Sequence, residues 1–150
     1  MFKKILIPTD GSEQANKALE IACQMALLNN SQINILSVFR HHSFIEGSLS
    51  MLPRQINDKV FNLEDALGEY SKEIVTQAKE IAFSHGLKKE DVKGFVRIGQ
   101  IAKEILKFVK DKDIDIIVIG KQGKGDLSGY LLGGVSHKVA GLAKIPVLVV

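Results

Sequence analysis

The feature that most constrains the fold of this chain is a regular alternation between two hydrophobic periods. Short aliphatic runs, typical of strands, alternate with stretches in which apolar residues recur three and four positions apart, as on one face of a helix. The predicted strands are residues 3–8, 33–39, 91–98, 115–119 and 145–150. The predicted helices are residues 13–26, 60–81, 101–109 and 135–142. This order predicts a parallel α/β sheet with helices on both faces, joined by right-handed crossovers.

We expect residues 1–150 to form a single domain, because 150 residues that are 45% hydrophobic can bury a core without a disulfide or metal. Cys23 is the sole cysteine, which excludes an intramolecular disulfide framework and a multi-cysteine zinc site. A formal charge of +3 does not indicate a nucleic-acid or membrane-surface binder. The sequence contains neither the ~20-residue apolar run of a membrane helix nor a secretory signal. We therefore expect a soluble, cytoplasmic protein.

Residues 40–57 interrupt the alternation, because they show no clear period and include Pro53. We expect an irregular loop there that acts as a lid or a partner surface. The loop contains His41 and His42, which we interpret as solvated side chains because no third metal ligand is in register.

Two apolar features are expected to belong to the core. Cys23 lies on the buried stripe of the first helix, where a packed thiol is favoured over a reactive one. The spacing of Leu63, Leu67 and Tyr70 predicts that these side chains also face the core rather than a cofactor.

The candidate binding residues follow the ends of the predicted strands. Ligands of open parallel sheets bind outside the carboxyl ends of the strands, where the strand order reverses. Asp10 follows the first strand, where it could either contact a ligand or cap the first helix. Seven of the thirteen glycines lie between Gly120 and Gly141, directly after the fourth strand.

Glycine-rich turns that enter a helix can present free backbone N–H groups to an anion, so this segment predicts a phosphate site. Lys121 and Lys124 add positive charge nearby, and Asp126 is expected to point outward or bind a cation, because it would repel phosphate. A solvated surface loop is the alternative interpretation. The chain has neither the Gly-Lys-Ser/Thr tripeptide of a P-loop nor a dinucleotide fingerprint after its first strand.

Several motifs together resemble the universal stress protein family. They are the glycine pattern Gly120-x2-Gly123-x9-Gly133, its continuation Gly134-Val135-Ser136, and residues 5–12, 115–120 and 145–150. The resemblance implies a five-stranded parallel sheet of order 3-2-1-4-5 and a homodimer formed through the C-terminal strand, residues 146–150. Members with an intact glycine motif typically bind ATP.

The resemblance also implies a set of contacts for an adenine nucleotide. Asp10 would face the adenosine, the Val38 backbone would meet the adenine edge, and Ser136 would offer its N–H and hydroxyl to the phosphates. The residues expected to bind ATP, with Mg²⁺ accompanying the triphosphate, are Pro8, Thr9, Asp10, Val38, Gly120, Gly123, Gly133, Gly134, Val135 and Ser136.

Gly134 departs from the family pattern, which usually has Ser or Thr at this position. One hydrogen bond to a charged phosphate contributes about 1.5–3 kcal/mol, so the missing hydroxyl predicts a loss of roughly ten- to hundredfold in affinity. The leading hypothesis is an ATP-binding regulatory protein of the stress-response type. A nucleotide-free, homodimeric partner-binding module and a slow ATPase remain alternatives; Gln122 and Ser136 are the loop candidates for hydrolysis.

Overall fold

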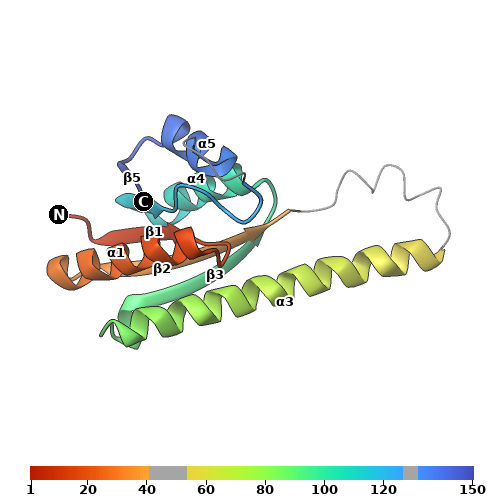
Figure 1. Cartoon of the computed structure of the whole chain (residues 1–150), viewed down its shortest axis with the longest axis horizontal. Coiled ribbons are helices and arrows are strands. Elements are labelled where there is room, and N and C mark those ends of the chain that lie inside the picture. Colours follow the sequence, from red (N-terminus) through yellow and green to blue (C-terminus); the bar gives the residue numbers. More distant parts are fainter. Residues whose placement is uncertain (41–53, 127–131) are drawn as a thin grey trace.

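Five aliphatic segments form one parallel sheet in the computed structural model, which describes residues 1–40, 54–126 and 132–150. The sheet order is β3-β2-β1-β4-β5, which confirms the predicted fold class (Figure 1). The strands are β1 (Lys4–Pro8), β2 (Gln32–Phe39), β3 (Val92–Ile98), β4 (Ile116–Ile119) and β5 (Val147–Val149). A short 3-10 turn, η1 (Lys89–Asp91), precedes β3.

The central strand β1 is buried on both faces because its side chains alternate between two apolar layers. Ile5 and Ile7 contribute to the core on one face, and Leu6 contributes to the core on the other. β1 pairs in parallel with β2 and with β4, so that Ile5 lies opposite Ile33 on one side and Ile116 on the other. A strand covered on both faces requires a nearly continuous apolar sequence, which residues 4–8 provide.

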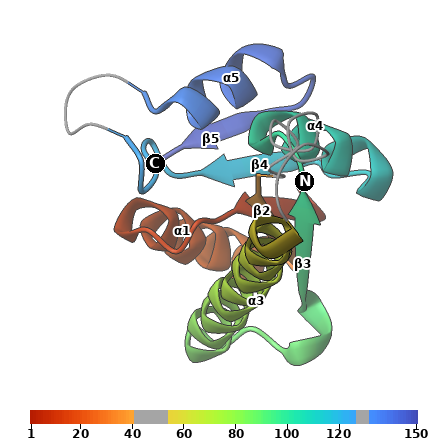
Figure 2. The same cartoon turned by 90° about the vertical axis from the view of Figure 1, so that its right-hand side faces the viewer.

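The helices form one layer on each face of the sheet (Figure 2). α1 (Glu13–Asn29) and α3 (Arg54–Ser84) cover the face of Ile5 and Ile7, whereas α4 (Ile101–Lys112) and α5 (Gly134–Leu142) cover the face of Leu6. α1 packs through alanines, whose small side chains allow the helix to lie close to the sheet. Cys23 lies among them at 0% exposure, as predicted, and burial raises the pKa of its thiol to about 11.

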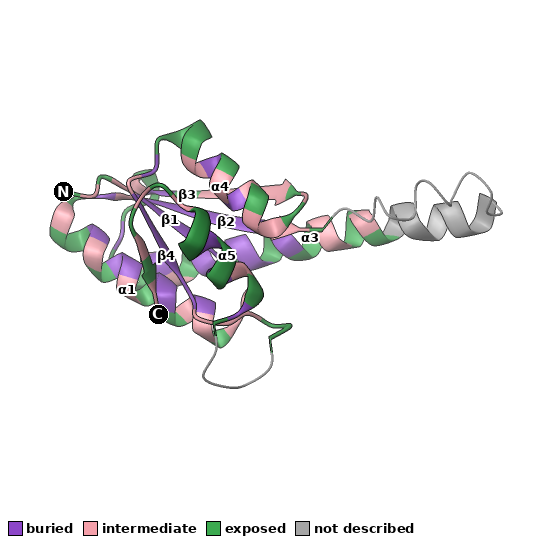
Figure 3. Ribbon diagram, turned by 90° about the horizontal axis from the view of Figure 1, so that it is seen from above, coloured by how far each residue is buried: buried purple, intermediate pink, exposed green. Residues whose placement is uncertain are grey.

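Helix α3 corrects two expectations. It begins at Arg54, so residues 54–57 are helical rather than part of an irregular loop. Residues 41–53 of that predicted loop, with His41 and His42, lie outside the described residues. Leu63 and Tyr70 are 45% and 47% exposed, so the prediction that they are core residues was wrong. α3 extends past the sheet, and among its side chains from residue 63 onward the first buried one is Ser71 (Figures 1 and 3).

Gly94, within β3, has a packing role. A Cβ at this position would lie 2.4 Å from Cγ1 of Val75 on α3. The glycine therefore allows α3 to approach the sheet where Val75, Ala78 and Ala82 are buried. Among the described residues, no helix is both long enough and apolar enough to span a membrane.

Candidate functional site

The strand order reverses between β1 and β4, and the candidate site lies at their carboxyl ends. The chain leaves β1 for α1 on one face and leaves β4 for the segment leading to α5 on the other. The two segments meet where the backbone N–H of Lys124 donates a hydrogen bond of 2.7 Å to Oδ2 of Asp10. The sequence prediction that these two segments share one site is consistent with this contact.

The turn after β1 is held by hydrogen bonds within the protein itself. The N–H of Thr9 donates to the carbonyl of Leu36 at 2.9 Å, which continues the pairing of β1 with β2 beyond Pro8. Oγ1 of Thr9 accepts the N–H of Gly11 at 3.1 Å, and Gly11 adopts a φ of +76°, which favours glycine. Thr9 is buried and therefore shapes the turn.

The Asp10 carboxylate joins the two segments of the site. Oδ1 accepts the N–H of Ser12 at 2.9 Å, while Oδ2 accepts the N–H of Lys124. Burial acts to raise the pKa of Asp10, but hydrogen bonds from Ser12 and from the backbone of Lys124 outweigh it and hold the pKa below its usual value. The cap of α1 is Ser12, whose Oγ accepts the N–H of Ala15 at 3.2 Å. Asp10 thus remains ionised and orients the glycine-rich segment.

Two glycines of the predicted motif each leave space for a different neighbour. A Cβ at Gly120 would lie 2.8 Å from the carbonyl carbon and oxygen of Gln14, so this glycine permits close packing of β4 against the first turn of α1. A Cβ at Gly123 would lie 2.6 Å from Oδ2 of Asp10. Gly123 therefore lets the Asp10 carboxylate reach the segment.

Asp126 is exposed, but its carboxylate turns back onto the glycine-rich segment rather than away from it, which corrects the expectation from the sequence. Its Oδ2 accepts the N–H of Gly123 at 2.6 Å, and its Oδ1 accepts the N–H of Gly134 at 3.4 Å. A Cβ at Gly133 would lie 2.1 Å from Oδ2 of Asp126, so the glycine leaves the space that the carboxylate occupies. An anionic group of the chain itself is therefore bound by backbone N–H groups of the segment that the sequence predicted to bind phosphate.

The first turn of α5 holds the predicted phosphate-facing residues. Gly133 is the N-cap and has no side chain to accept the free N–H groups. The hydroxyl of Ser136 is buried and lies within hydrogen-bond distance of the carbonyls of Lys121 and Gly133, at 2.7 and 3.0 Å. Since the N–H of Gly133 also donates to the carbonyl of Lys121 at 2.9 Å, Ser136 fixes the two ends of the glycine-rich segment together.

Lys124 and Tyr70 form a contact that the sequence did not predict. Nζ of Lys124 hydrogen-bonds the hydroxyl of Tyr70 on α3 and lies 5.0 Å from the centre of its ring. The same Nζ would be 3.4 Å from a Cβ at Gly11, so Lys124 passes over the turn after β1. No local pattern signals this pair, because its members are 54 positions apart.

Val38 lies on β2, where it is half-buried and packs against the core beneath α4. Its predicted backbone contact with adenine stays a prediction. In residues 1–40, 63–126 and 132–150, no group of three or more His, Cys, Asp or Glu side chains is arranged to hold a metal ion.

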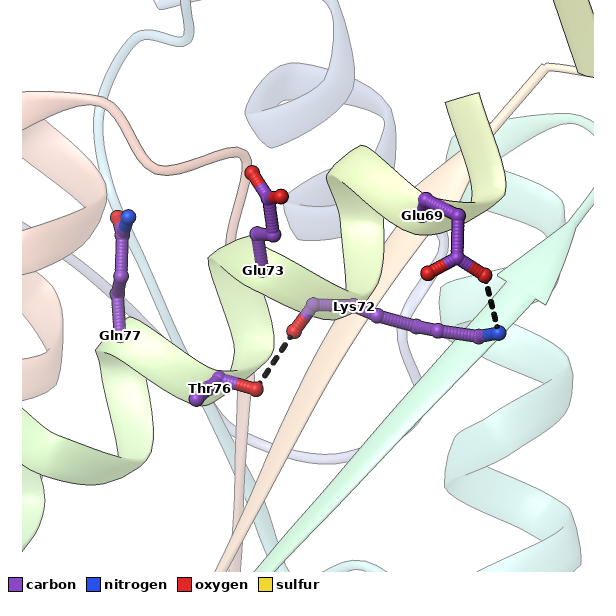
Figure 4. A pocket seen from close by; sticks show the side chains of 5 residues that line it. All are labelled: Glu69, Lys72, Glu73, Thr76 and Gln77. Carbon is purple, nitrogen blue, oxygen red and sulfur yellow. Dashed lines mark hydrogen bonds and ion pairs between the residues drawn. The ribbon is translucent and has the colours of Figure 1, made fainter. Parts of the chain in front are cut away.

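A surface hollow on α3 is a poor alternative site. It is lined by Glu69, Lys72, Glu73, Thr76 and Gln77, all from one helix (Figure 4). Nζ of Lys72 pairs with Oε1 of Glu69 at 2.7 Å, and the hydroxyl of Thr76 donates to the carbonyl of Lys72 at 2.9 Å. These are contacts within an exposed helix face, whereas the β1–β4 site combines several elements and backbone donors.

The fold and the site define a doubly wound α/β protein with an anion held by backbone N–H groups where the strand order reverses. Comparison with known proteins gives the family. The chain belongs to the universal stress protein family, whose model matches residues 1–150.

Two relatives are similar over nearly their full lengths. Universal stress protein YxiE of Bacillus subtilis is 35% identical, covering 100% of this chain and 99% of YxiE. Universal stress protein MJ0577 of Methanocaldococcus jannaschii is 30% identical, covering 100% and 95%, and the solved structure of MJ0577 matches with a TM-score of 0.81. The crystal structure of a universal stress protein in complex with cAMP matches with a TM-score of 0.73 at 22% identity, covering 99% of this chain and 97% of that one. The likeness to the cAMP complex shows the fold alone.

Proposed function

We propose that this chain is an ATP-binding regulatory protein of the stress-response type, acting in the cytoplasm. The observation that carries the proposal is the capture of an anionic carboxylate by the N–H groups of Gly123 and Gly134 at the switch point of the sheet. A protein of the same fold has been solved in complex with cAMP, so an adenine nucleotide is the ligand class proposed here. ATP is proposed because the glycine spacing resembles that of the family's ATP-binding branch, apart from Gly134 at the position usually held by Ser or Thr.

In the proposed complex the adenosine lies towards Asp10 and the backbone of Val38, with Pro8 and Thr9 beneath it. The phosphates take the N–H groups of Gly123, Gly134 and the following residues of α5. Gly120 and Gly133 act by leaving space, and Val135 and Ser136 contribute backbone N–H groups. Mg²⁺ would arrive on the triphosphate, because the described side chains form no carboxylate cage of their own.

Nucleotide-free partner binding remains the second candidate, because Asp126 already satisfies two of the donors and Gly134 lacks a hydroxyl. Hydrolysis has less support. The Ser136 hydroxyl is directed at two backbone carbonyls rather than at a position where it could attack or orient a nucleophile.

Isothermal titration with ATP and Mg²⁺ tests the proposal. We expect saturable binding below millimolar nucleotide, and its loss in Gly123→Val, whose Cβ would meet Oδ2 of Asp10 at 2.6 Å. Gly125→Val is the matched control, because a Cβ there meets nothing within 4 Å. Absence of heat at two temperatures up to near-millimolar ATP would exclude ATP binding and favour the partner-binding module.

A further inference from the structure

The Asp126 carboxylate holds the donors on which the proposed nucleotide site depends. Oδ2 takes the N–H of Gly123 and Oδ1 takes the N–H of Gly134, so the two oxygens bridge the end of the loop and the start of α5. A carboxylate that accepts backbone N–H groups in this way is the closest equivalent, among side chains, of two phosphate oxygens.

The same donors cannot serve Asp126 and a phosphate at full strength. Each backbone N–H carries one hydrogen, and a hydrogen bond weakens steeply when that hydrogen is shared between acceptors in different directions. The carboxylate also fills the space, because Oδ2 lies where a Cβ on Gly133 would be 2.1 Å away and one on Gly123 would be 3.6 Å away.

Charge opposes joint occupancy as well. Oδ2 of Asp10 lies 2.6 Å from the Cβ position of Gly123, so two carboxylates already flank this glycine. A phosphate that entered beside them would be a third negative group within a few ångströms, where like charges repel strongly. The carboxylate that can leave is Asp126, which is exposed, whereas Asp10 is half-buried and hydrogen-bonded to Ser12 and Lys124.

We propose that Asp126 is an internal competitor of the nucleotide's phosphates: it occupies their position in the free protein and is displaced when they bind. The inference deepens the proposed function and rests on it. It makes Asp126 a residue that sets affinity for the phosphate-bearing part of the ligand while leaving recognition of adenosine unchanged. The backbone of Asp126 is held in a turn, where its N–H donates to the carbonyl of Gly123 at 3.3 Å.

The first experiment compares ATP, AMP and adenosine by isothermal titration on the full chain and on Asp126→Ala and Asp126→Asn. We expect Asp126→Ala to bind ATP about tenfold more tightly, with AMP following in the same direction if its phosphate reaches the loop. Adenosine should bind all three proteins equally. Asp126→Asn keeps one acceptor oxygen without the charge and should fall between the other two.

The control for net charge is Asp113→Asn. Asp113 is exposed, lies before the amino end of β4 whereas the loop follows its carboxyl end, and has a φ of +52°, which Asn tolerates. The substitution Asp113→Asn makes the same change in net charge as Asp126→Asn, and we expect it to leave ATP affinity unchanged. A gain of affinity in Asp113→Asn equal to that in Asp126→Asn would mean that net charge, not displacement, is responsible, and would overturn the inference.

A second measurement separates this inference from the proposed function. Inorganic tripolyphosphate is titrated into ¹⁵N-labelled protein while the amide signals of Gly123 and Gly134 are followed by NMR. We expect these signals to respond at about tenfold lower concentration in Asp126→Ala than in the unchanged chain, even if adenine recognition is absent.

Coincident titration curves, or no response of these amides in either protein, would overturn the inference whatever ATP does. The inference would also be overturned if Asp126→Ala bound ATP more weakly than the unchanged chain only when Mg²⁺ is present. Asp126 would then be a ligand of the cation in the complex. If neither the unchanged chain nor Asp126→Ala binds ATP but the tripolyphosphate response is as expected, the proposed ATP binding is rejected. The inference that Asp126 competes with phosphates then stands.

Discussion

Three glycines of the segment after β4 are each required by a different neighbour, and a fourth is not. Gly120 lies against the backbone of Gln14, Gly123 against the Asp10 carboxylate, and Gly133 against the Asp126 carboxylate, whereas a Cβ at Gly134 would meet nothing within 4 Å. The spacing therefore encodes the packing of α1 and the placement of two carboxylates as well as an approach for a ligand. Of these four glycines, Gly134 is the one where a side chain can be added without a clash.

Gly134→Ser is expected to strengthen ATP binding about tenfold, because it restores a hydroxyl at the start of α5 that can donate to a charged phosphate oxygen. The backbone tolerates the change, since Gly134 is not among the described glycines with positive φ. Titration of ATP measures the effect, and Gly134→Ala separates the hydroxyl from the loss of glycine freedom. Equal gains in Gly134→Ser and Gly134→Ala would refute a role for the hydroxyl.

At the scale of secondary structure, sequence periodicity locates a helix but not the point where its support ends. It predicted the C-terminal part of α3, whose Val75, Ala78 and Ala82 are buried. It failed for Leu63 and Tyr70, because the same apolar stripe continues into residues 63–70 of α3, where no side chain is buried. The need for glycine at position 94 also depends on a distant element, because the side chain that would clash with a Cβ there belongs to α3 and not to β3.

Gly94→Ala is expected to destabilise the protein by about 1–3 kcal/mol, because its Cβ would lie 2.4 Å from Cγ1 of Val75, a buried β-branched side chain with little freedom to move. Gly141→Ala is the matched control: nothing lies within 4 Å of its Cβ position in α5, so it should be neutral or stabilise by up to about 1 kcal/mol. Urea unfolding of both variants gives the two free energies. Equal stabilities would show that α3 can shift away from the sheet at little cost.

For the whole molecule, the alternation of periods was sufficient to predict the parallel sheet, because each crossover is local in sequence and right-handed by default. The strand order and the nucleotide residues came from motif resemblance instead. The inward turn of Asp126 and the pairing of Lys124 with Tyr70 were beyond both approaches. They depend on where a loop and a distant helix meet, which periodicity along one segment does not describe.

The edge of the sheet leads to the last prediction, that the chain forms a symmetric homodimer through residues 146–150. β5 is an edge strand of the sheet, its side chains are partly exposed, and Leu148 is 37% exposed. An apolar edge strand without a charged residue tends to pair with another copy unless it is covered, and a two-fold axis lets one surface serve both copies. Sedimentation at micromolar concentration should give twice the 16.5 kDa of one chain. Leu148→Glu should shift the protein to monomer, whereas Leu28→Glu, the same change at an 85% exposed leucine of α1, should leave the dimer intact. A monomer for the unchanged chain, or equal dissociation by both variants, would remove β5 as the interface.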